Sequence, residues 1–245
     1  TEVYQSGILN NTDIIQNGND NDAYVDQYAD PNSDQHEFGN VATVSQTDDG
    51  NISDVYQSGI LNNIDITQKG YDNHAFVDQY EFGNTATISQ NGDRNISDIY
   101  QSGNSNNSDI FQHGNDNNAD IEQRGTFNVV DLSQDGNGNN ADIYQNGNGN
   151  FVGGIDFTNS PWPLPDLYII NLSKPAEQWN GASFSSVQDG NLNRIGLYQA
   201  QGNNYSVHFE QSGTGNTIKF YQTGSLGDDV SIIQNGWDSH LEVIN

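Results

Sequence analysis

The glutamines of this chain form its most regular set of polar side chains. From Gln46 to Gln145, a glutamine recurs every 11 residues. A side-chain amide both donates and accepts hydrogen bonds, and amides stacked at strand spacing form ladders. Burying many amides is costly unless they are hydrogen-bonded. The spacing therefore predicts a structural amide ladder, with no catalytic and no cofactor-binding residue.

The same step runs through most of the chain, and asparagine and glycine follow it. The glutamines assigned to the ladder are Gln5, Gln16, Gln27, Gln46, Gln57, Gln68, Gln79, Gln90, Gln101, Gln112, Gln123, Gln134, Gln145, Gln188, Gln199, Gln211, Gln222 and Gln234. An asparagine five residues later joins them, at Asn62, Asn73, Asn84, Asn95, Asn106, Asn117, Asn128 and Asn139. A glycine two residues after the glutamine supplies a tight turn, at Gly59, Gly70, Gly92, Gly103, Gly114, Gly125, Gly136 and Gly147.

Each unit must place these residues on a strand that is followed by a turn. In one unit, every second residue is expected to point inward, and these residues are Asn139, Ala141, Ile143 and Gln145. Asp142 and Tyr144 alternate with them, which is the period of a strand and not of a helix. If successive units fold back and every second unit stacks at about 4.8 Å, each glutamine lies on the glutamine 22 residues away. The sequence predicts an all-β, two-sheet β-solenoid of stacked strand-turn-strand rungs with cross-β spacing.

Two interruptions divide the repeats. The segment VYQSGILNN at Val3 returns at Val55, an offset of four units plus about eight residues, which places an insertion at about 29–36. The step from Gln145 to Gln188 is 43 residues, and one imperfect unit can be laid after Gln145 with Asp156 in the position of a glutamine. We therefore predict repeats over 1–156, an insertion over 157–181 and repeats over 182–245.

The second insertion is rich in proline and aromatic residues. Proline cannot donate to a continuous strand ladder, so the segment is predicted to be a loop extruded from the stack. Its apolar side chains favour packing on the outside of a sheet, and they are Trp162, Leu164, Leu167, Tyr168, Ile169 and Ile170. Two interpretations stay open: a tolerated insertion that covers an edge, or a patch that binds a partner.

The outward positions carry the acidic residues. Directly before the glutamine, tyrosine alternates with an acid on one sheet, which keeps like charges apart. Three positions before it, Asp98, Asp120 and Asp142 would stack on neighbouring rungs and repel one another. Weak cation binding along this column stays open beside simple solvation. The histidines lie far apart and are predicted to be solvated, with no metal site: His36, His74, His113, His208 and His240.

Composition restricts the partners. The chain has 33 acidic and 6 basic residues and a net charge of -27, which argues against nucleic acid because phosphate binding depends on Lys and Arg. No apolar run is long enough for a membrane helix, so membrane insertion is not expected. The 37 Asn, 21 Gln and 26 Gly indicate repetitive sequence rather than a conventional enzyme, and none of the common catalytic motifs is present.

The repeat resembles the curlin repeat of the curli fibre subunits. The matching residues run through Asn73, Ala75, Val77 and Gln79, and then through the next unit at Asn84, Ala86, Ile88, Gln90, Gly92 and Asn95. The resemblance implies a secreted, extracellular functional amyloid of a bacterial surface, which self-assembles head to tail for biofilm matrix and adhesion. It also implies a homologous nucleator subunit and a dedicated secretion or chaperone system as partners. The regular series of inward glutamines and asparagines favours a major, fibre-forming subunit.

Two other functions fit a β-solenoid. One is a monomeric secreted adhesin, and the other is an enzyme that acts on polysaccharides through a pair of carboxylates. Such proteins cap the ends of the solenoid to block edge pairing, whereas the first residues here, Thr1 to Gln5, already fit a strand. The repeat and the resemblance together favour the fibre subunit, with copies of itself as the main partner.

Overall fold

A computed structural model gives the fold and describes residues 1–7, 9–28, 39–153, 155–156, 169–170, 176–179, 183–200, 206–223 and 229–244. Within these residues the chain forms strands and turns and contains no helix, so none that could cross a bilayer. The alternation of inward and outward residues in the repeat explains this, because interior strands such as β5 and β9 bury one face and expose the other to solvent.

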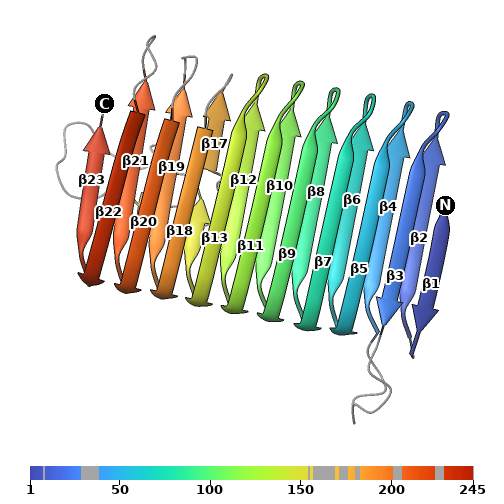
Figure 1. The fold of residues 1–245 in the computed structure, drawn as a ribbon, viewed down its shortest axis with the longest axis horizontal. Helices are drawn as coiled ribbons and strands as arrows, with labels where there is room; N and C mark the ends of the chain where they lie inside the picture. The colour runs from blue at the N-terminus through green and yellow to red at the C-terminus, as the bar shows by residue number, and fades with distance from the viewer. Residues whose placement is uncertain are drawn as a thin grey trace.

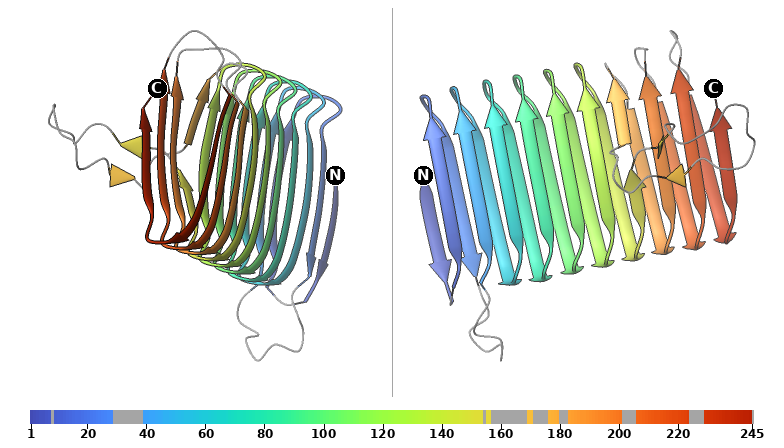
Figure 2. Two further views of the ribbon diagram at one scale, coloured as in Figure 1. Left: turned by 60° about the vertical axis from the view of Figure 1, so that its left-hand side comes forward. Right: turned by 180° about the vertical axis from the view of Figure 1, so that it is seen from behind.

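The strands form two long parallel sheets that face each other (Figures 1 and 2). Sheet A contains β1 (Glu2–Ser6), β3 (Asp22–Tyr28), β5 (Ile52–Ile60), β7 (His74–Phe82), β9 (Ile96–Asn104), β11 (Asn118–Thr126), β13 (Asn140–Asn148), β18 (Ser183–Asn191), β20 (Ser206–Thr214) and β22 (Asp229–Trp237), in that order. Sheet B contains β2 (Asn11–Asn17), β4 (Val41–Thr47), β6 (Asn63–Lys69), β8 (Thr85–Asn91), β10 (Asn107–His113), β12 (Val129–Asp135), β14 (Phe151–Gly153), β19 (Arg194–Ala200), β21 (Thr217–Thr223) and β23 (His240–Ile244), together with β17 (Ala176–Trp179). The chain passes from one sheet to the other at each turn, which confirms the predicted two-sheet β-solenoid.

The register follows the glutamine step. Gln57 pairs with Gln79 on the next rung of sheet A, and Gln46 pairs with Gln68 on the next rung of sheet B. Every inward residue therefore lies on the inward residue of the neighbouring rung. Since a shift of one residue would expose the whole inward set, the repeat itself fixes this register.

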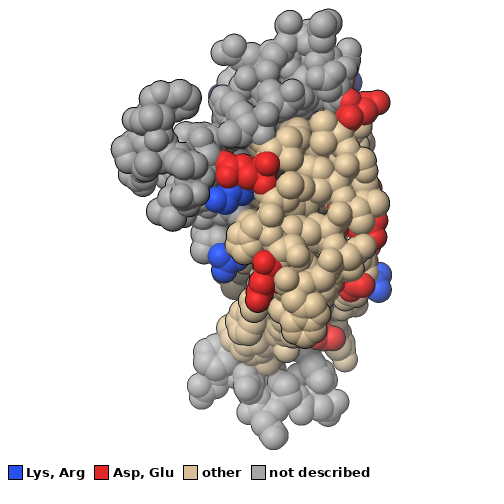
Figure 3. Space-filling model, turned by 90° about the vertical axis from the view of Figure 1, so that its left-hand side faces the viewer, with Lys and Arg blue, Asp and Glu red and all other residues tan. Residues whose placement is uncertain are grey.

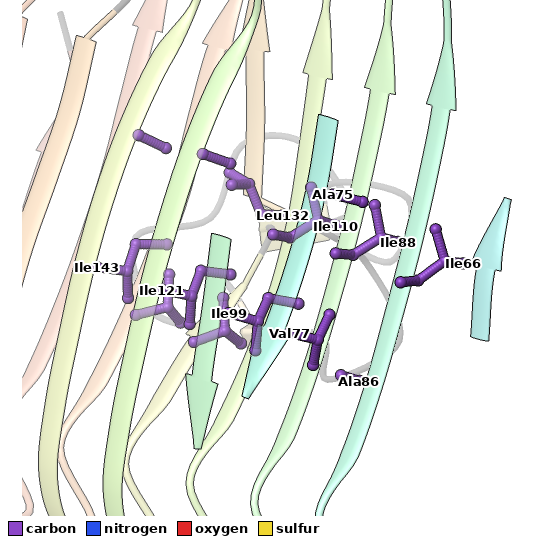
Figure 4. Close-up of a cluster of buried hydrophobic side chains, with 14 of the residues drawn as sticks. Ile66, Ala75, Val77, Ala86, Ile88, Ile99, Ile110, Ile121, Leu132 and Ile143 are labelled. Carbon is purple, nitrogen blue, oxygen red and sulfur yellow. The ribbon is translucent and has the colours of Figure 1, made fainter. Parts of the chain in front are cut away.

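Between the sheets lies a continuous apolar core. In Figure 4, Ile66, Ile88, Ile110 and Leu132 form a row from sheet B, and Val77, Ile99, Ile121 and Ile143 form a row from sheet A. All of these side chains are buried. Burial of a large aliphatic side chain stabilises the fold by about 1.5 to 3 kcal/mol, so each rung adds a similar increment.

Aromatic residues fill the core near the C-terminal end. Phe209 lies between Phe184 and Phe220, with ring centroids 5.8 and 5.4 Å apart and the rings edge to face. All three rings are fully buried. They replace the small and aliphatic inward residues of the earlier rungs.

The turn glycines adopt backbone angles that L-residues avoid. All eight glycines predicted for the turns have positive φ, between 104° and 124°. They also stack closely: a Cβ at Gly103 would lie only 2.0 Å from the carbonyl oxygen of Gly125 on the next rung. Glycine is therefore required both by the turn and by the approach of the neighbouring turn.

The second interruption differs from the prediction. β14 ends at Gly153, and Asp156 does not take the position of a glutamine in sheet B. Instead, β15 (Ile155–Asp156) pairs antiparallel with β16 (Ile169–Ile170) in a separate two-stranded sheet. A carboxylate cannot donate to an amide ladder and would carry charge into a buried column, which explains why the chain leaves the stack here.

The chain returns to the same rung before the repeats resume. β17 pairs in parallel with β12, and Gln178 lies in register with Gln134. Residues 176–179 of the segment 157–181 are therefore part of sheet B and not of an extruded loop. The predicted packing of Trp162, Leu164, Leu167 and Tyr168 lies outside the described residues, and of Ile169 and Ile170 only the backbone, in β16, is described.

The first interruption leaves the register intact. Gln16 pairs with Gln46, a separation of 30 residues in place of 22. The inserted segment lies between β3 and β4, and residues 29–38 are outside the described part of the chain.

Candidate functional site

The glutamines of sheet A form one hydrogen-bonded ladder. From Gln5 to Gln211, each Nε2 donates to the Oε1 of the glutamine on the next rung, over 2.7 to 3.0 Å. The bond between Gln145 and Gln188 keeps this geometry across the second insertion, at 2.7 Å. All these bonds point the same way, from the N-terminal rung toward the C-terminal one.

Sheet B carries a second ladder with the same direction. From Gln16 to Gln112, each Nε2 donates to the Oε1 on the next rung, over 2.7 to 3.0 Å. Farther along, the backbone register places Gln178 beside Gln134 and pairs Gln199 with Gln222. The side chains of Gln178, Gln199 and Gln222 are outside the described set.

A single glutamine shows how the buried amides are satisfied. Gln101 accepts from Gln79 at Oε1 over 2.8 Å. Its Nε2 donates to Gln123 over 2.8 Å, to the backbone oxygen of Thr85 on the facing sheet over 3.0 Å and to Ser108 Oγ over 3.2 Å. The ladder therefore links successive rungs and also the two sheets, and the buried amide carries no unpaired group.

The asparagines form ladders of the opposite sense. The backbone N–H of Asn95 and its Nδ2 both donate to Asn73 Oδ1 on the preceding rung, over 3.0 and 3.1 Å. Nδ2 also donates to the oxygen of Gly114, over 2.8 Å. All eight asparagines assigned from the sequence are buried. Six of them, from Asn73 to Asn128, donate to the backbone oxygen of the turn glycine on the next rung, whereas Asn62 donates to the backbone oxygen of Glu81.

The glutamines of the ladders are less buried at the two ends of the stack than in its interior. Gln5 is exposed, and Gln16 and Gln234 are half-buried, whereas the other described glutamines of the ladder are buried. No described side chain donates to Gln5 Oε1 or accepts from Gln234 Nε2. The ladder of sheet A therefore ends in an acceptor on the first rung and in a donor on the last, whereas the first acceptor of the sheet B ladder, Gln16 Oε1, accepts from Thr1 Oγ1.

The outer face of sheet A has the predicted alternation. Asp78 pairs in register with Tyr56 on one side and Tyr100 on the other. The column that contains Asp98, Asp120 and Asp142 stacks on neighbouring rungs. Burial raises the pKa of Asp98 and of Asp120, and the charge of neighbouring carboxylates raises both further.

No metal site is evident in the described part of the chain, where no group of three or more His, Asp or Glu residues is arranged to hold an ion. Among the described histidines, His113 pairs with Asp135 over 3.2 Å on the outer face of sheet B. His36 lies outside the described residues. Cation binding by the column of Asp98, Asp120 and Asp142 stays a prediction.

One carboxylate of sheet B is unusual. Asp131 lies in register with Asp109, whereas nearer the N-terminus of this column acids alternate with threonines, as Asp65 neighbours Thr43 and Thr87. Burial and the charge of Asp109 raise the pKa of Asp131 to about 6. Its Oδ1 is buried and has no hydrogen-bond partner among the described residues.

The sequence prediction missed two parts of the ladder. Inward serines replace alanine on some rungs and bond to the glutamines, as Ser97 Oγ donates to Gln112 Oε1 over 2.9 Å. Gln178 was the second omission. A signal for it existed, because Gln178 follows Gln134 by two rung steps of 22 residues. The prolines before it and Asp156 at the 11-residue step obscured that signal.

The fold and the buried amides define a parallel β-solenoid held together by polar ladders. The family model described as Curlin associated repeat matches residues 1–28, 62–92, 83–114, 98–125 and 114–147. A comparison with curated proteins finds no match. The chain contains several curlin associated repeats and belongs to that family. The family is structural rather than enzymatic, and its members are extracellular fibre proteins.

Proposed function

We propose that this chain is the major structural subunit of a curli-like functional amyloid fibre, to which copies of the chain add end to end. The observation that carries the proposal is the direction of the glutamine ladder. Because every described bond runs from Nε2 to the next Oε1, the acceptor at one end and the donor at the other are complementary. A second copy can therefore continue the ladder only head to tail, which is a contact that does not close and produces a filament.

Both ends of the stack also present strand edges. β1 and β2 lie at one end of the two sheets, and β22 and β23 lie at the other. All residues of β1 are exposed, whereas an interior strand such as β9 buries every second residue. Edge strands with free N–H and C=O groups readily pair with another chain.

The repeat register specifies how the two edges would meet. Aligning Gln234 of one copy with Gln5 of the next places Ile232 beside Val3 and Ile233 beside Tyr4. Val3, Tyr4 and Ile233 are exposed in the single chain, by 43, 55 and 62 %. The contact would remove these apolar side chains from water while it extends the ladder.

The charge distribution at the C-terminal end is compatible with this contact. Figure 3 views this end, where the described surface is mostly uncharged and the carboxylates lie mainly toward its margin. A net charge of -27 still opposes close approach of two copies, so assembly is expected to depend on ionic strength.

The cellular setting of the proposal follows from the family. The fibre is secreted, lies outside the cell and contributes to biofilm matrix and adhesion. A homologous nucleator subunit and a dedicated secretion or chaperone system complete the set of partners. The curlin associated repeats support this part of the proposal.

Electron microscopy and fibre diffraction of the purified chain test the proposal. We expect filaments with a meridional reflection at about 4.8 Å. Gln234→Glu keeps the acceptor of the last rung but removes its donor, so we expect elongation to slow by about tenfold or more. Asn235→Asp adds the same charge at an exposed position of the same strand and is the matched control. Discrete particles that persist at high concentration would contradict the proposal.

A further inference from the structure

Three tyrosine rings on the outer face of sheet A lie in a continuous row across neighbouring rungs. The Tyr80 centroid is 5.4 Å from that of Tyr56 and 5.5 Å from that of Tyr100, with the ring planes tilted by 41° and 42°. All three side chains are partly exposed. We propose that Tyr80 is an oxidative crosslinking site, which couples to Tyr56 or Tyr100 as dityrosine under the action of a peroxidase and peroxide.

The row depends on the position of Tyr80 in its repeat. Tyr56 and Tyr100 each precede the ladder glutamine of their strand, and Asp78 lies between them in register. They are therefore two rungs apart, about 10 Å at cross-β spacing. Tyr80 follows its glutamine instead, and from this neighbouring column its ring reaches both of the others. Without the Tyr80 phenol, Tyr56 and Tyr100 are too far apart to couple.

Neighbouring side chains limit the reaction to these partners. The guanidinium of Arg124 lies over the Tyr100 ring, 5.7 Å from its centroid, on the rung that follows. Tyr144, one rung farther, has no ring contact with another described tyrosine. Tyr28 holds the position equivalent to Tyr80 on β3 but likewise contacts no described tyrosine ring. Among the described residues, the other tyrosine pair in contact is Tyr4 on β1 and Tyr24 on β3, with ring centroids 5.7 Å apart.

The chemistry requires an external oxidant. A haem peroxidase removes one electron and one proton from each of two phenols, and the two radicals form a carbon–carbon bond between ring positions next to the hydroxyls. The two ring protons displaced by this bond return to the oxygens, so both phenols are restored. Overall, two phenols and one hydrogen peroxide give one dityrosine and two waters. Burial and the charge of Asp78 raise the pKa of Tyr80, so the neutral phenol is the species that is oxidised.

The product would be a covalent tie between adjacent rungs. The chain has no cysteine and so has no disulfide that could hold the stack. Tyr56 and Tyr80 lie on β5 and β7, and Tyr100 lies on β9. Either crosslink closes a loop of one rung and restricts the unfolded chain, in the way that a disulfide does.

Treatment of the full chain with a haem peroxidase and hydrogen peroxide tests the proposal, with dityrosine fluorescence and mass spectrometry of proteolytic peptides as readouts. We expect crosslinked peptides that join Tyr80 to Tyr56 and to Tyr100. An equal mixture of light and heavy isotope-labelled chains should give crosslinks within one label only. In strong denaturant, both peptides should be lost because the register is lost.

Tyr80→Phe is the decisive variant, because it keeps the ring but removes the phenol. We expect loss of both peptides, whereas the Tyr4–Tyr24 peptide should remain and show that the variant is folded. Tyr71→Phe is the matched control: Tyr71 is 52 % exposed at a turn, and its loss should change neither crosslink. Two results would overturn the proposal. One is a crosslink yield that increases with the exposure of each tyrosine, with Tyr71 as a main site, and the other is an unchanged dityrosine yield in Tyr80→Phe.

Discussion

Gln101 donates through Nε2 to Gln123 Oε1 over 2.8 Å, and both side chains are fully buried. The same amide accepts from Gln79 and donates to Thr85 and Ser108, so it joins three rungs and both sheets. In a low-dielectric core, the hydrogen bonds of an amide offset the free-energy cost of removing it from water. An amide that loses one such partner still has that cost, without the hydrogen bond that offset it. The ladder is therefore both a source of stability and a strict constraint on which residue can occupy the column.

Replacement of one ladder glutamine should be strongly destabilising. In Gln101→Ala, Gln79 Nε2 and Gln123 Oε1 each lose a partner and a cavity forms, so we expect the free energy of unfolding to fall by roughly 3 kcal/mol. Urea denaturation of the variant measures this value. Ser102→Ala, on the outward side of the same strand, is the control and should change stability by less than about 0.5 kcal/mol. Similar losses from both variants would show that the ladder has no special role.

The stacked turns should discriminate between glycines. Gly103 has a φ of 111°, and a Cβ there would lie 2.0 Å from the carbonyl oxygen of Gly125. We expect Gly103→Ala to lower the free energy of unfolding by about 3 kcal/mol or more, since the strained φ and the close approach add together.

Gly138→Ala is the matched control for this turn effect. Gly138 also has a positive φ, of 68°, but a Cβ there would have no atom within 4 Å. Only the cost of the left-handed backbone applies, about 1 kcal/mol. Thermal unfolding of the two variants side by side gives the comparison. Equal midpoints would mean that the approach of neighbouring turns contributes nothing.

Most of the fold could be predicted because the repeat encodes it several times over. The 11-residue spacing of the glutamines predicted where the strands lie, which residues point inward and how the strands are in register, as the pairing of Gln57 with Gln79 shows. The return of the chain to sheet B at Gln178 was missed, since β17 has only four residues and lacks the asparagine of a full unit. Inward serines such as Ser108 were missed because alternation identifies a buried position and not the hydrogen bonds made there.

The raised pKa of Asp131 predicts a pH dependence of stability. The folded state holds this proton up to a pKa of about 6, above the ordinary value of 3.8. Between these values the folded chain binds more protons than the unfolded chain, so the free energy of unfolding should fall as the pH rises from about 4 to 7. The raised pKa values of Asp54, Asp78, Asp98 and Asp120 act in the same direction.

Asp131→Asn isolates this contribution. We expect it to stabilise the chain at pH 7 by on the order of 1 kcal/mol, less than the full pKa difference implies because solvent screens a partly exposed group. At pH 4 the gain should disappear. Asp65→Asn serves as the control, because Asp65 is exposed and lies between Thr43 and Thr87. A gain from Asp131→Asn that is the same at both pH values would exclude a titration effect.

The proposed junction between copies contains one unfavourable charge pair. In the repeat register, β23 of one copy meets β2 of the next, and Glu242 then lies opposite Asp13. On its other side, within the same chain, Glu242 is in register with Lys219. Two carboxylates one rung apart repel each other, and salt screens this repulsion. Glu242→Gln should therefore speed filament elongation severalfold at low ionic strength, and the variant and the parent chain should converge at about 1 M salt. Light scattering from seeded reactions measures both rates. Glu210→Gln removes the same charge from β20, away from the junction, and should leave a smaller effect; equal acceleration by the two variants would show that net charge, and not this register, governs elongation.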